Sequence, residues 1–517
     1  MKRPRFLLAA LALLLAGPVL GQAPAPASPE ATRAARIAAV FPVLDKLYAD
    51  FAAQQRVPGL AYGLVVDGQL VHTGSVGYTD VGARTAVTPQ SVFRIASMTK
   101  SFVALAVLRL RDEGRLHLDD PAENYLPELK KAPHASSDAP PITIRQLLSH
   151  SAGLPEDNPW GDRQMGRSDA ELSALVGRGL SYSNAPGGHY EYSNLGYALL
   201  GRLVTRVSGQ PVQAYISAKI LRPLGMSHTT WDYQQVPAAR LAHGYGAPTA
   251  TGPGPEEPLL PKGESFAALG GLLTSIEDFA KYLAFQADAW ARPITAAAPD
   301  AGPVRRSSVR EMQQPWAFNS LNRSFRYLSG RACPLSLSYG YGLRIAQDCD
   351  GRRYVGHSGG LPGFGSYWLL LPEYGIGVVA FTNQTYTAPT AQHYAALDTL
   401  IALAGLRPRA VAASAILAQR KAELAALLPD FNTPVTNPIF AENFFLDEDL
   451  STRRKAAQAL LAQAGPLRSV GALEPENQLR GRFQLRGERA TVEVFFTLSP
   501  ENPARVQHLD LKLIPAP

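Results

Sequence analysis

Two periods of apolar and polar positions run along the N-terminal part of the chain. Residues 31–54 repeat apolar side chains at helical spacing and predict a helix. Residues 60–66 and 69–76 are apolar, β-branched runs on either side of Asp67-Gly68, a dipeptide typical of a two-residue hairpin turn. The sequence therefore predicts a helix followed by two antiparallel strands.

The same pattern returns about 300 residues later. Residues 366–371 and 376–382 flank Pro372-Glu-Tyr-Gly375 and predict a second hairpin, and helical spacing follows over residues 395–403. Between the hairpins the apolar spacing is mainly helical, as in residues 276–285, which follow a capping serine at position 275. We expect one antiparallel sheet, flanked by terminal helices and carrying an inserted helical region, within residues 33–406.

The remaining residues predict a smaller second unit. Residues 407–431 are interpreted as a helical connector, and residues 432–517 as an α+β accessory domain whose helix covers 440–464. Alternating strands are expected at 478–485, 491–498 and 505–513. This unit loosely resembles the cystatin-like cone. Pro/Gly/Ala-rich loops are expected at 247–261 and 292–303.

The first residues indicate export. A basic start with Lys2, Arg3 and Arg5 precedes an apolar run and a small-residue stretch, which is typical of a signal peptide over residues 1–23. The alternative, an anchor helix, is disfavoured because the run is short and contains Pro18. Residues 24–32 are interpreted as a tether. We therefore expect a periplasmic or secreted protein without stable membrane insertion after cleavage.

Composition narrows the class further. Hydrophobic residues make up 46% and charged residues 18% of the 517 residues, as in a globular protein. The net charge of +7 includes three basic residues of the predicted signal peptide, so the rest is too mildly basic to indicate nucleic-acid binding. Cys333 and Cys349 fit either one disulfide in an oxidising compartment or two buried thiols.

Ser97 and Lys100 are the first candidate catalytic pair, at i and i+3 where a helical pattern begins. A serine hydroxyl needs a neighbouring base, and a helix N-terminus offers N–H groups to an oxyanion. Lys100 is a base only if burial and nearby cations lower its pKa. This spacing recurs by chance in a chain of this length, so the pair alone identifies nothing.

Two later segments support the interpretation of Ser97 and Lys100 as a catalytic pair. Tyr192-Ser193-Asn194 supplies a phenol that can carry a proton, and an amide that can hold a substrate amide. His357-Ser358-Gly359-Gly360 precedes a predicted strand, and its small residues let a substrate backbone lie close.

This ordered triplet resembles the serine penicillin-recognising superfamily: class C β-lactamases, DD-carboxypeptidases, D-aminopeptidases and related esterases. The resemblance covers roughly residues 33–406 and is reinforced by phrases at 146–154, 241–245, 268–272 and 338–343. It implies a β-lactamase-like fold and an acyl-enzyme mechanism without a cofactor.

The resemblance also assigns roles. Ser97 matches the acylated serine, Lys100 its base and Tyr192 the second base. The substrate-binding set is Asn194, His357, Ser358, Gly359 and Gly360, with the N–H groups of Ser97 and Gly360 matching the oxyanion hole.

One position departs from the pattern of many β-lactamases, which have lysine where this chain has His357. A histidine with an ordinary pKa of about 6.5 is only fractionally charged at pH 7, so the binding of a substrate carboxylate should weaken. Arg344 or Arg94 can restore the charge, although both are more ordinary as surface or scaffold arginines. A peptidase, amidase or esterase is therefore favoured over a dedicated β-lactamase.

Other readings of the residues remain. Gly356–Gly360 also fits the Gly-x-Ser-x-Gly elbow with Ser358 as nucleophile, but an elbow requires a helix after the serine, and a strand pattern follows here. His150 is interpreted as a loop histidine bonded to backbone, and His189 as an exposed turn residue. The scattered histidines provide no metal-ligand spacing, so no metal is expected.

The sequence thus predicts an exported serine hydrolase acting on a small-molecule or peptide substrate with an amide or ester bond. The alternatives are a DD-carboxypeptidase or β-lactamase, and a non-catalytic sensor of β-lactams or peptidoglycan. The sequence leaves the oligomeric state open.

Overall fold

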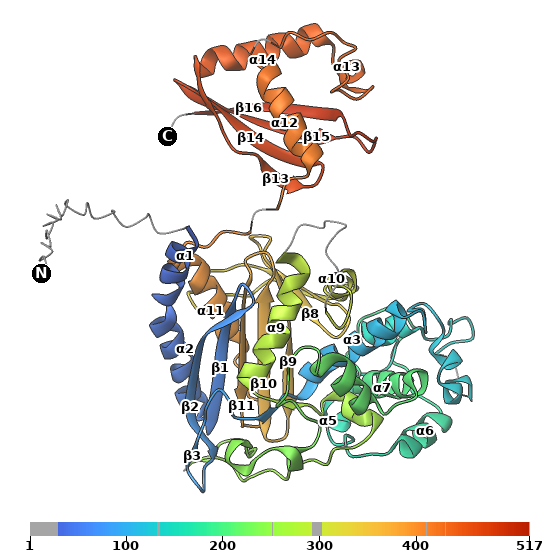
Figure 1. Cartoon of the computed structure of the whole chain (residues 1–517). Helices are drawn as coiled ribbons and strands as arrows, with labels where there is room; N and C mark the ends of the chain where they lie inside the picture. Colours follow the sequence, from blue (N-terminus) through green and yellow to red (C-terminus); the bar gives the residue numbers. More distant parts are fainter. Residues whose placement is uncertain are drawn as a thin grey trace, which may run out of the picture.

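A nine-stranded antiparallel sheet forms the centre of the main body (Figure 1). The computed structural model describes residues 29–131, 135–250, 252–291, 302–409, 411–429 and 431–515. The strand order is β3-β2-β1-β11-β10-β9-β8-β7-β6. The strands are β1 (Gly59–Val66), β2 (Gln69–Asp80), β3 (Thr85–Ala86), β6 (Ala317–Asn322), β7 (Leu335–Tyr339), β8 (Arg344–Gln347), β9 (Arg353–Leu361), β10 (Phe364–Leu371) and β11 (Ile376–Thr382). A separate two-stranded pair joins β4 (Phe93–Arg94) and β5 (Leu273–Thr274).

The predicted meeting of the two hairpins is confirmed. β1 pairs with β11 from Leu60 opposite Thr382 to Val66 opposite Ile376. Asp67 and Gly68 have φ of 49° and 82°, the left-handed conformation that a two-residue hairpin turn needs at both positions. Strands from opposite ends of this part of the chain therefore lie side by side at the centre of the sheet.

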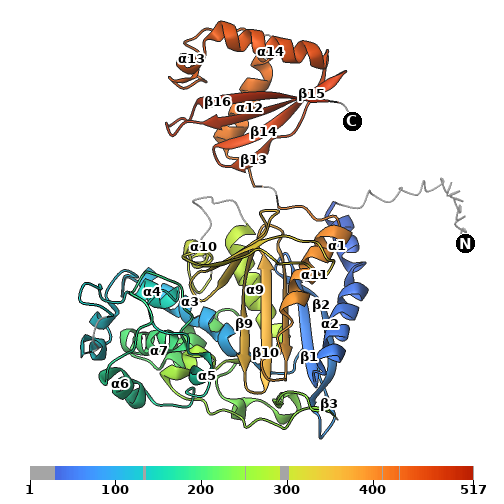
Figure 2. The same ribbon diagram turned by 180° about the vertical axis from the view of Figure 1, so that it is seen from behind.

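Helices cover both faces of the sheet, as the two opposite views show (Figures 1 and 2). One face packs against α1 (Pro29–Ala38), α2 (Phe41–Gln55) and α11 (Thr390–Leu403), and the other against α9 (Ile276–Ala291). Every residue of β1, β10 and β11 is buried. Burial on both faces explains why these strands are continuous apolar runs rather than alternating ones.

The inserted helical region is also confirmed, and it packs beside β9. Its helices are α3 (Thr99–Asp112), α4 (Ile144–Leu148), α5 (Asn158–Gly161), α6 (Asp169–Gly177), α7 (Asn194–Ser208) and α8 (Val212–Ile216), and α10 (Arg306–Met312) follows α9. One hydrophobic core joins α3, α7 and α9 to the sheet. The helical region is therefore held firmly against the strands, which fixes the site between them.

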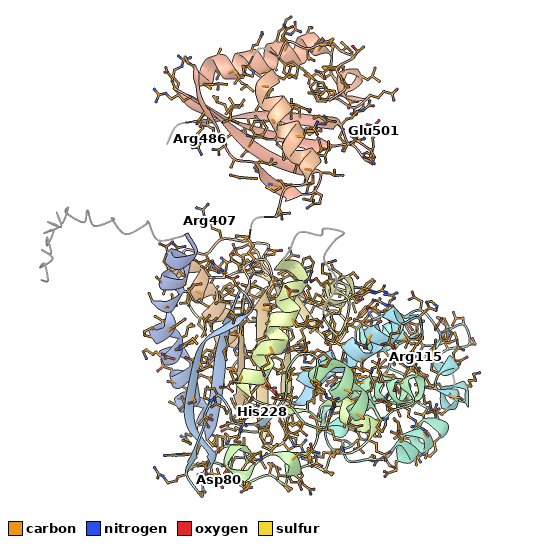
Figure 3. The ribbon with its side chains drawn as sticks, viewed as in Figure 1. Asp80, Arg115, His228, Arg407, Arg486 and Glu501 are labelled. Atoms are coloured by element: carbon orange, nitrogen blue, oxygen red, sulfur yellow. A yellow bond between two sulfur atoms is a disulfide. The ribbon has the colours of Figure 1, made fainter. Side chains whose placement is uncertain are left out.

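The C-terminal unit has its own sheet and its own core. Its helices are α12 (Ala415–Leu427), α13 (Phe444–Asp447) and α14 (Leu450–Ala464). Its strands are β12 (Leu467–Val470), β13 (Glu474–Asn477), β14 (Arg480–Gly487), β15 (Ala490–Leu498) and β16 (Val506–Pro515). Within the described part of the chain, the buried residues of this core run from Leu417 to Leu509. Arg486 and Glu501 lie on this unit, and Arg407 on the segment that leads to it (Figure 3).

Two predicted helices are each divided in the structure. The first breaks between Ala38 and Phe41, because Pro42 lacks an N–H and starts the new helix in its first turn. The helix expected over 440–464 breaks before Asp449, whose carboxylate accepts the N–H groups of Ser451 and Thr452. Helix α1 also begins at Pro29, inside the range predicted as a tether. The predicted signal peptide and most of the loop at 292–303 lie outside the described residues.

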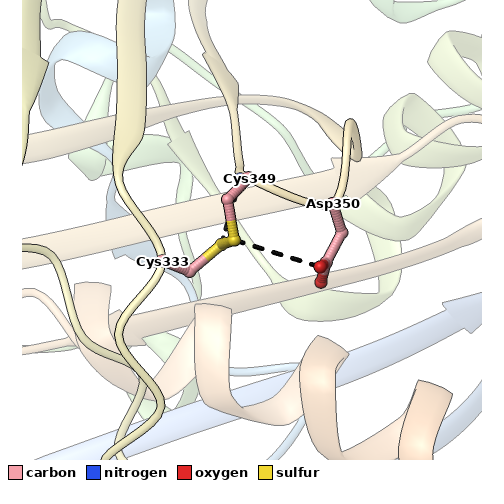
Figure 4. A group of neighbouring side chains, drawn as sticks. All are labelled: Cys333, Cys349 and Asp350. Carbon is pink, nitrogen blue, oxygen red and sulfur yellow. Dashed lines mark hydrogen bonds between the residues drawn. A yellow bond between two sulfur atoms is a disulfide. The ribbon is translucent and has the colours of Figure 1, made fainter.

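Cys333 and Cys349 form a disulfide with their Cα atoms 5.3 Å apart (Figure 4). The bond links the segment before β7 to the turn after β8. Asp350 lies beside the two sulfur atoms, but bonded sulfurs are not thiolates and do not offer a metal-binding group.

Within the described ranges, none of the helices combines the length and apolar character needed to cross a bilayer.

Candidate active site

Ser97 lies in a short 3-10 helix, η1 (Ala96–Met98), directly before α3. Ala96 has φ of 48°, a left-handed conformation that costs energy for a residue with a side chain. Its neighbour Ile95 is fixed on both sides, because its N–H donates to Leu272 O at 3.0 Å and its carbonyl accepts from Ser366 Oγ at 2.9 Å. The sheet and the helical region thus together hold the backbone that presents Ser97.

Lys100 lies one turn further on and is fully buried. Its Nζ is 3.0 Å from Ser97 Oγ, and it donates to Asn194 Oδ1 at 2.7 Å and to Leu269 O at 2.7 Å. Burial, with a smaller effect of Arg344, lowers the pKa of Lys100 to about 7, although Asp162 and Asp157 oppose the shift. A large fraction of the amine is therefore neutral near pH 7, beside the hydroxyl it would deprotonate.

Tyr192 lies two residues before α7, close to both Ser97 and Lys100. Lys100 Nζ is 5.0 Å from the centre of its ring, and a hydrogen bond joins its side chain to that of Ser97. Burial raises the pKa of Tyr192 well above its ordinary value, although Arg344 and Ser97 counteract this. The resting side chain is therefore a neutral phenol, suited to passing on a proton rather than to acting as a phenolate.

Asn194 connects Lys100 to α5. Its Oδ1 accepts from Lys100, and its Nδ2 donates to Asn158 Oδ1 at 3.0 Å. The side chain is fully buried. Both ends of the amide that the sequence assigns to substrate binding thus have a partner inside the protein.

His357 lies in β9 and is also fully buried. Its Nδ1 is 2.5 Å from the carbonyl of Ser358, so Nδ1 carries the hydrogen, and Nε2 accepts from Tyr339 Oη at 2.8 Å. Burial, Arg344 and Lys100 lower the pKa of His357 well below 6.5. The fractional charge expected at pH 7 from the sequence is therefore too high, because His357 is neutral.

The glycines after His357 allow close packing. A Cβ on Gly359 would lie 2.2 Å from Ile95 O, so β9 can approach the segment that carries Ser97 only without a side chain there. A Cβ on Gly360 would lie 2.7 Å from Cδ1 of Tyr386. Ser358 is half-buried within the strand. The elbow alternative fails here, since Ser358 has strand on both sides and no helix after it.

Arg344 lies in this site. The sequence analysis favoured a surface or scaffold position for it. Its Cζ is 5.6 Å from the ring centre of Tyr192, and its Nε is buried without a partner. Burial lowers the pKa of Arg344, but the surrounding tyrosines raise it further, so it stays cationic. No ion pair to Arg344 is found among the residues that the structure describes. Arg94 instead donates to Leu260 O and is a buried scaffold residue.

The two histidines near the site behave as the sequence predicts. His150 is a loop residue whose Nδ1 accepts the Ser193 N–H at 3.1 Å, so it positions the start of α7. His189 is exposed.

Sequence reasoning missed Tyr339, Tyr386 and Asp162. Tyr339 belongs to one of the quoted phrases, at 338–343, whereas nothing local distinguishes the other two.

Comparison with known proteins identifies the family. The profile described as Beta-lactamase matches residues 44–403. The chain belongs to the beta-lactamase family. The fold of this beta-lactamase-family chain is also that of the octameric penicillin-binding protein homologue from Pyrococcus abyssi, with a TM-score of 0.56 at 24% identity, covering 92% of this chain and 96% of that one.

Two sequence relatives illustrate the range of the family. Protein flp of Staphylococcus aureus (strain N315) is 29% identical over 357 residues, which are 68% of this chain and 65% of flp. The unguisins hydrolase ungD' of Aspergillus campestris is 29% identical over 373 residues, 69% of this chain and 65% of that protein. The chain thus spans about 65% of the length of each of these two relatives.

Proposed function

We propose that this beta-lactamase-family protein is an exported serine hydrolase that forms an acyl-enzyme on Ser97 with amide or ester substrates. The D-amino-acid peptidase, amidase or esterase type is favoured. The observation that carries the proposal is a buried Lys100 amine, 3.0 Å from Ser97 Oγ, with a pKa near 7. A relative named as a hydrolase supports hydrolytic chemistry.

The residues suggest a complete cycle. Ser97 Oγ attacks the substrate carbonyl carbon while its proton passes to Lys100 Nζ, and backbone N–H groups of Ser97 and Gly360 would stabilise the oxyanion. The bond to the leaving group breaks as Tyr192 passes it a proton, with Lys100 restoring the phenol. Water then attacks the acyl carbonyl, gives its proton to the same relay, and releases the acid and free Ser97. Each step uses side chains and water alone.

Two observations support export. The N-terminal sequence is typical of a signal peptide, and the Cys333–Cys349 disulfide is the kind of bond that persists in oxidising compartments.

A substrate panel tests the proposal. We expect the wild-type protein to hydrolyse p-nitrophenyl butyrate with at least about 100-fold higher kcat/KM than nitrocefin, because neutral His357 replaces a permanent cation. Both reactions are followed by absorbance, with a fluorescent penicillin as an active-site label. Faster turnover of nitrocefin would favour a β-lactamase, and stable labelling without any turnover would favour a sensor.

Arg344 predicts a preference among leaving groups. We expect the enzyme to favour a 3-carboxyphenyl ester over the phenyl ester of the same acid, because Arg344 is a cation without an acidic partner beside Tyr192. Arg344→Gln should reduce this ratio of kcat/KM about tenfold, whereas Arg84→Gln, an exposed cation elsewhere, should leave it unchanged. An unchanged ratio in Arg344→Gln would show that Arg344 does not bind the carboxylate.

A further inference from the structure

Asp162 is a buried carboxylate that the proposed cycle does not use. It follows α5 directly and is 3% exposed. Its Oδ2 accepts a hydrogen bond from Tyr386 Oη at 3.0 Å. Among the residues that the structure describes, no second hydrogen bond to the carboxylate and no ion pair is found, which is unusual for a buried charge.

The nearby Asp157 differs from Asp162, because both of its carboxylate oxygens are used in a structural role. Its two oxygens accept the backbone N–H groups of Asn194 at 2.5 Å and Leu195 at 2.8 Å. Asp157 therefore satisfies the first turn of α7 and has no oxygen left over. Asp162 has no such task, since within the described ranges its carboxylate bonds to a single phenol.

Tyr386 links Asp162 to β9. The backbone N–H of Tyr386, at φ 51°, bonds to Phe364 O at 3.2 Å, and its ring lies against Gly360. The ring of Tyr386 therefore lies between Gly360 of β9 and Asp162. One of its edges is near Gly360, and its hydroxyl bonds to Asp162. The adjacent Gly161 packs against Asn194, because a Cβ on that glycine would lie 2.5 Å from Asn194 Cβ, and Lys100 is the strongest of the charges that act on Asp162. The carboxylate therefore lies beside the reacting centre, on the Gly360 and Asn194 side.

The negative charge of Asp162 has no bonded cation among the described residues. Burial raises the pKa of Asp162 to about 6, so the group is mostly ionised at pH 7. Lys100 and the exposed Arg163 act on it only through space. Both ends of the Asn194 amide are occupied, whereas the carboxylate of Asp162 has bonding capacity to spare.

We propose that Asp162 and Tyr386 form a subsite on the acyl side that binds the ammonium group of the substrate. The preferred substrates are then amides or esters of amino acids whose α-amino group is free. This inference deepens the proposed function and rests on it.

Paired substrates test the subsite. We expect wild-type kcat/KM for D-alanine p-nitroanilide to exceed that for its N-acetyl derivative at least tenfold. Asp162→Asn should lower the first value by about 10- to 100-fold and the second by less than about threefold. Tyr386→Phe should lower the first value by less than Asp162→Asn does. The matched control is Asp50→Asn, an exposed carboxylate on α2 that should change neither value.

Three outcomes overturn the subsite: a wild-type preference for the acetylated substrate, no preference, or an equal fall of both values in Asp162→Asn. The last would make Asp162 a positioning residue for Lys100. Calorimetry with Ser97→Ala adds a test without turnover and without altering Asp162, since D-alaninamide should bind at least tenfold more tightly than its N-acetyl form. Ser97-dependent hydrolysis of p-nitrophenyl acetate, which has no ammonium, separately tests the proposed function.

Discussion

Replacing Ser97 by alanine is expected to lower kcat for p-nitrophenyl butyrate by roughly 10³-fold or more, to the background rate. The reason is that Ser97 Oγ is the hydroxyl whose neighbours are a buried amine at 3.0 Å and a hydrogen-bonded phenol. Without the oxygen no acyl-enzyme forms. The measurement is initial-rate kinetics together with mass spectrometry of the trapped acyl-enzyme, which should be absent in the variant.

Ser358→Ala is the informative comparison, because Ser358 is the nucleophile of the rejected elbow. Its place inside β9 predicts a loss of less than about tenfold, from weaker substrate binding alone. A full loss in Ser358→Ala with retained activity in Ser97→Ala would reverse the assignment.

Replacing Lys100 by methionine is expected to lower kcat by about 10²- to 10⁴-fold, the usual contribution of a positioned general base. In the wild-type protein, burial lowers the pKa of Lys100 to about 7. In the proposed cycle the neutral amine is the active form, so kcat/KM should rise with pH through about 7 and level off above it. This limb of the pH profile should disappear with the lysine.

Lys100→Arg separates the base from the charge. Arginine keeps a cation and hydrogen-bond donors, but its guanidinium does not lose a proton at working pH. We therefore expect Lys100→Arg to be as inactive as Lys100→Met, with thermal unfolding used to check that both variants fold. An active Lys100→Arg would contradict proton abstraction by Lys100.

The site was only partly predictable. The pairing of Ser97 with Lys100 follows from helical spacing, a local property, and Tyr192, Asn194 and His357 were found through a family resemblance. The neutral state of His357 was not predictable, because it depends on Tyr339, Arg344 and Lys100 packing around the ring. Asp162 and Tyr386, 224 residues apart, had no signal at all.

Elements whose periodicity or turn chemistry is local were predictable from the amino-acid sequence. These are the two hairpins, the helices that start at Ser275 and near Ser97, and the three alternating strands of the C-terminal unit. The packing of distant segments set the register of β1 against β11, the order of β6 to β9, and which polar groups lost water. The physical reason is that hydrogen bonding along the chain depends on near neighbours, whereas burial and charge depend on whichever distant segments pack against a residue.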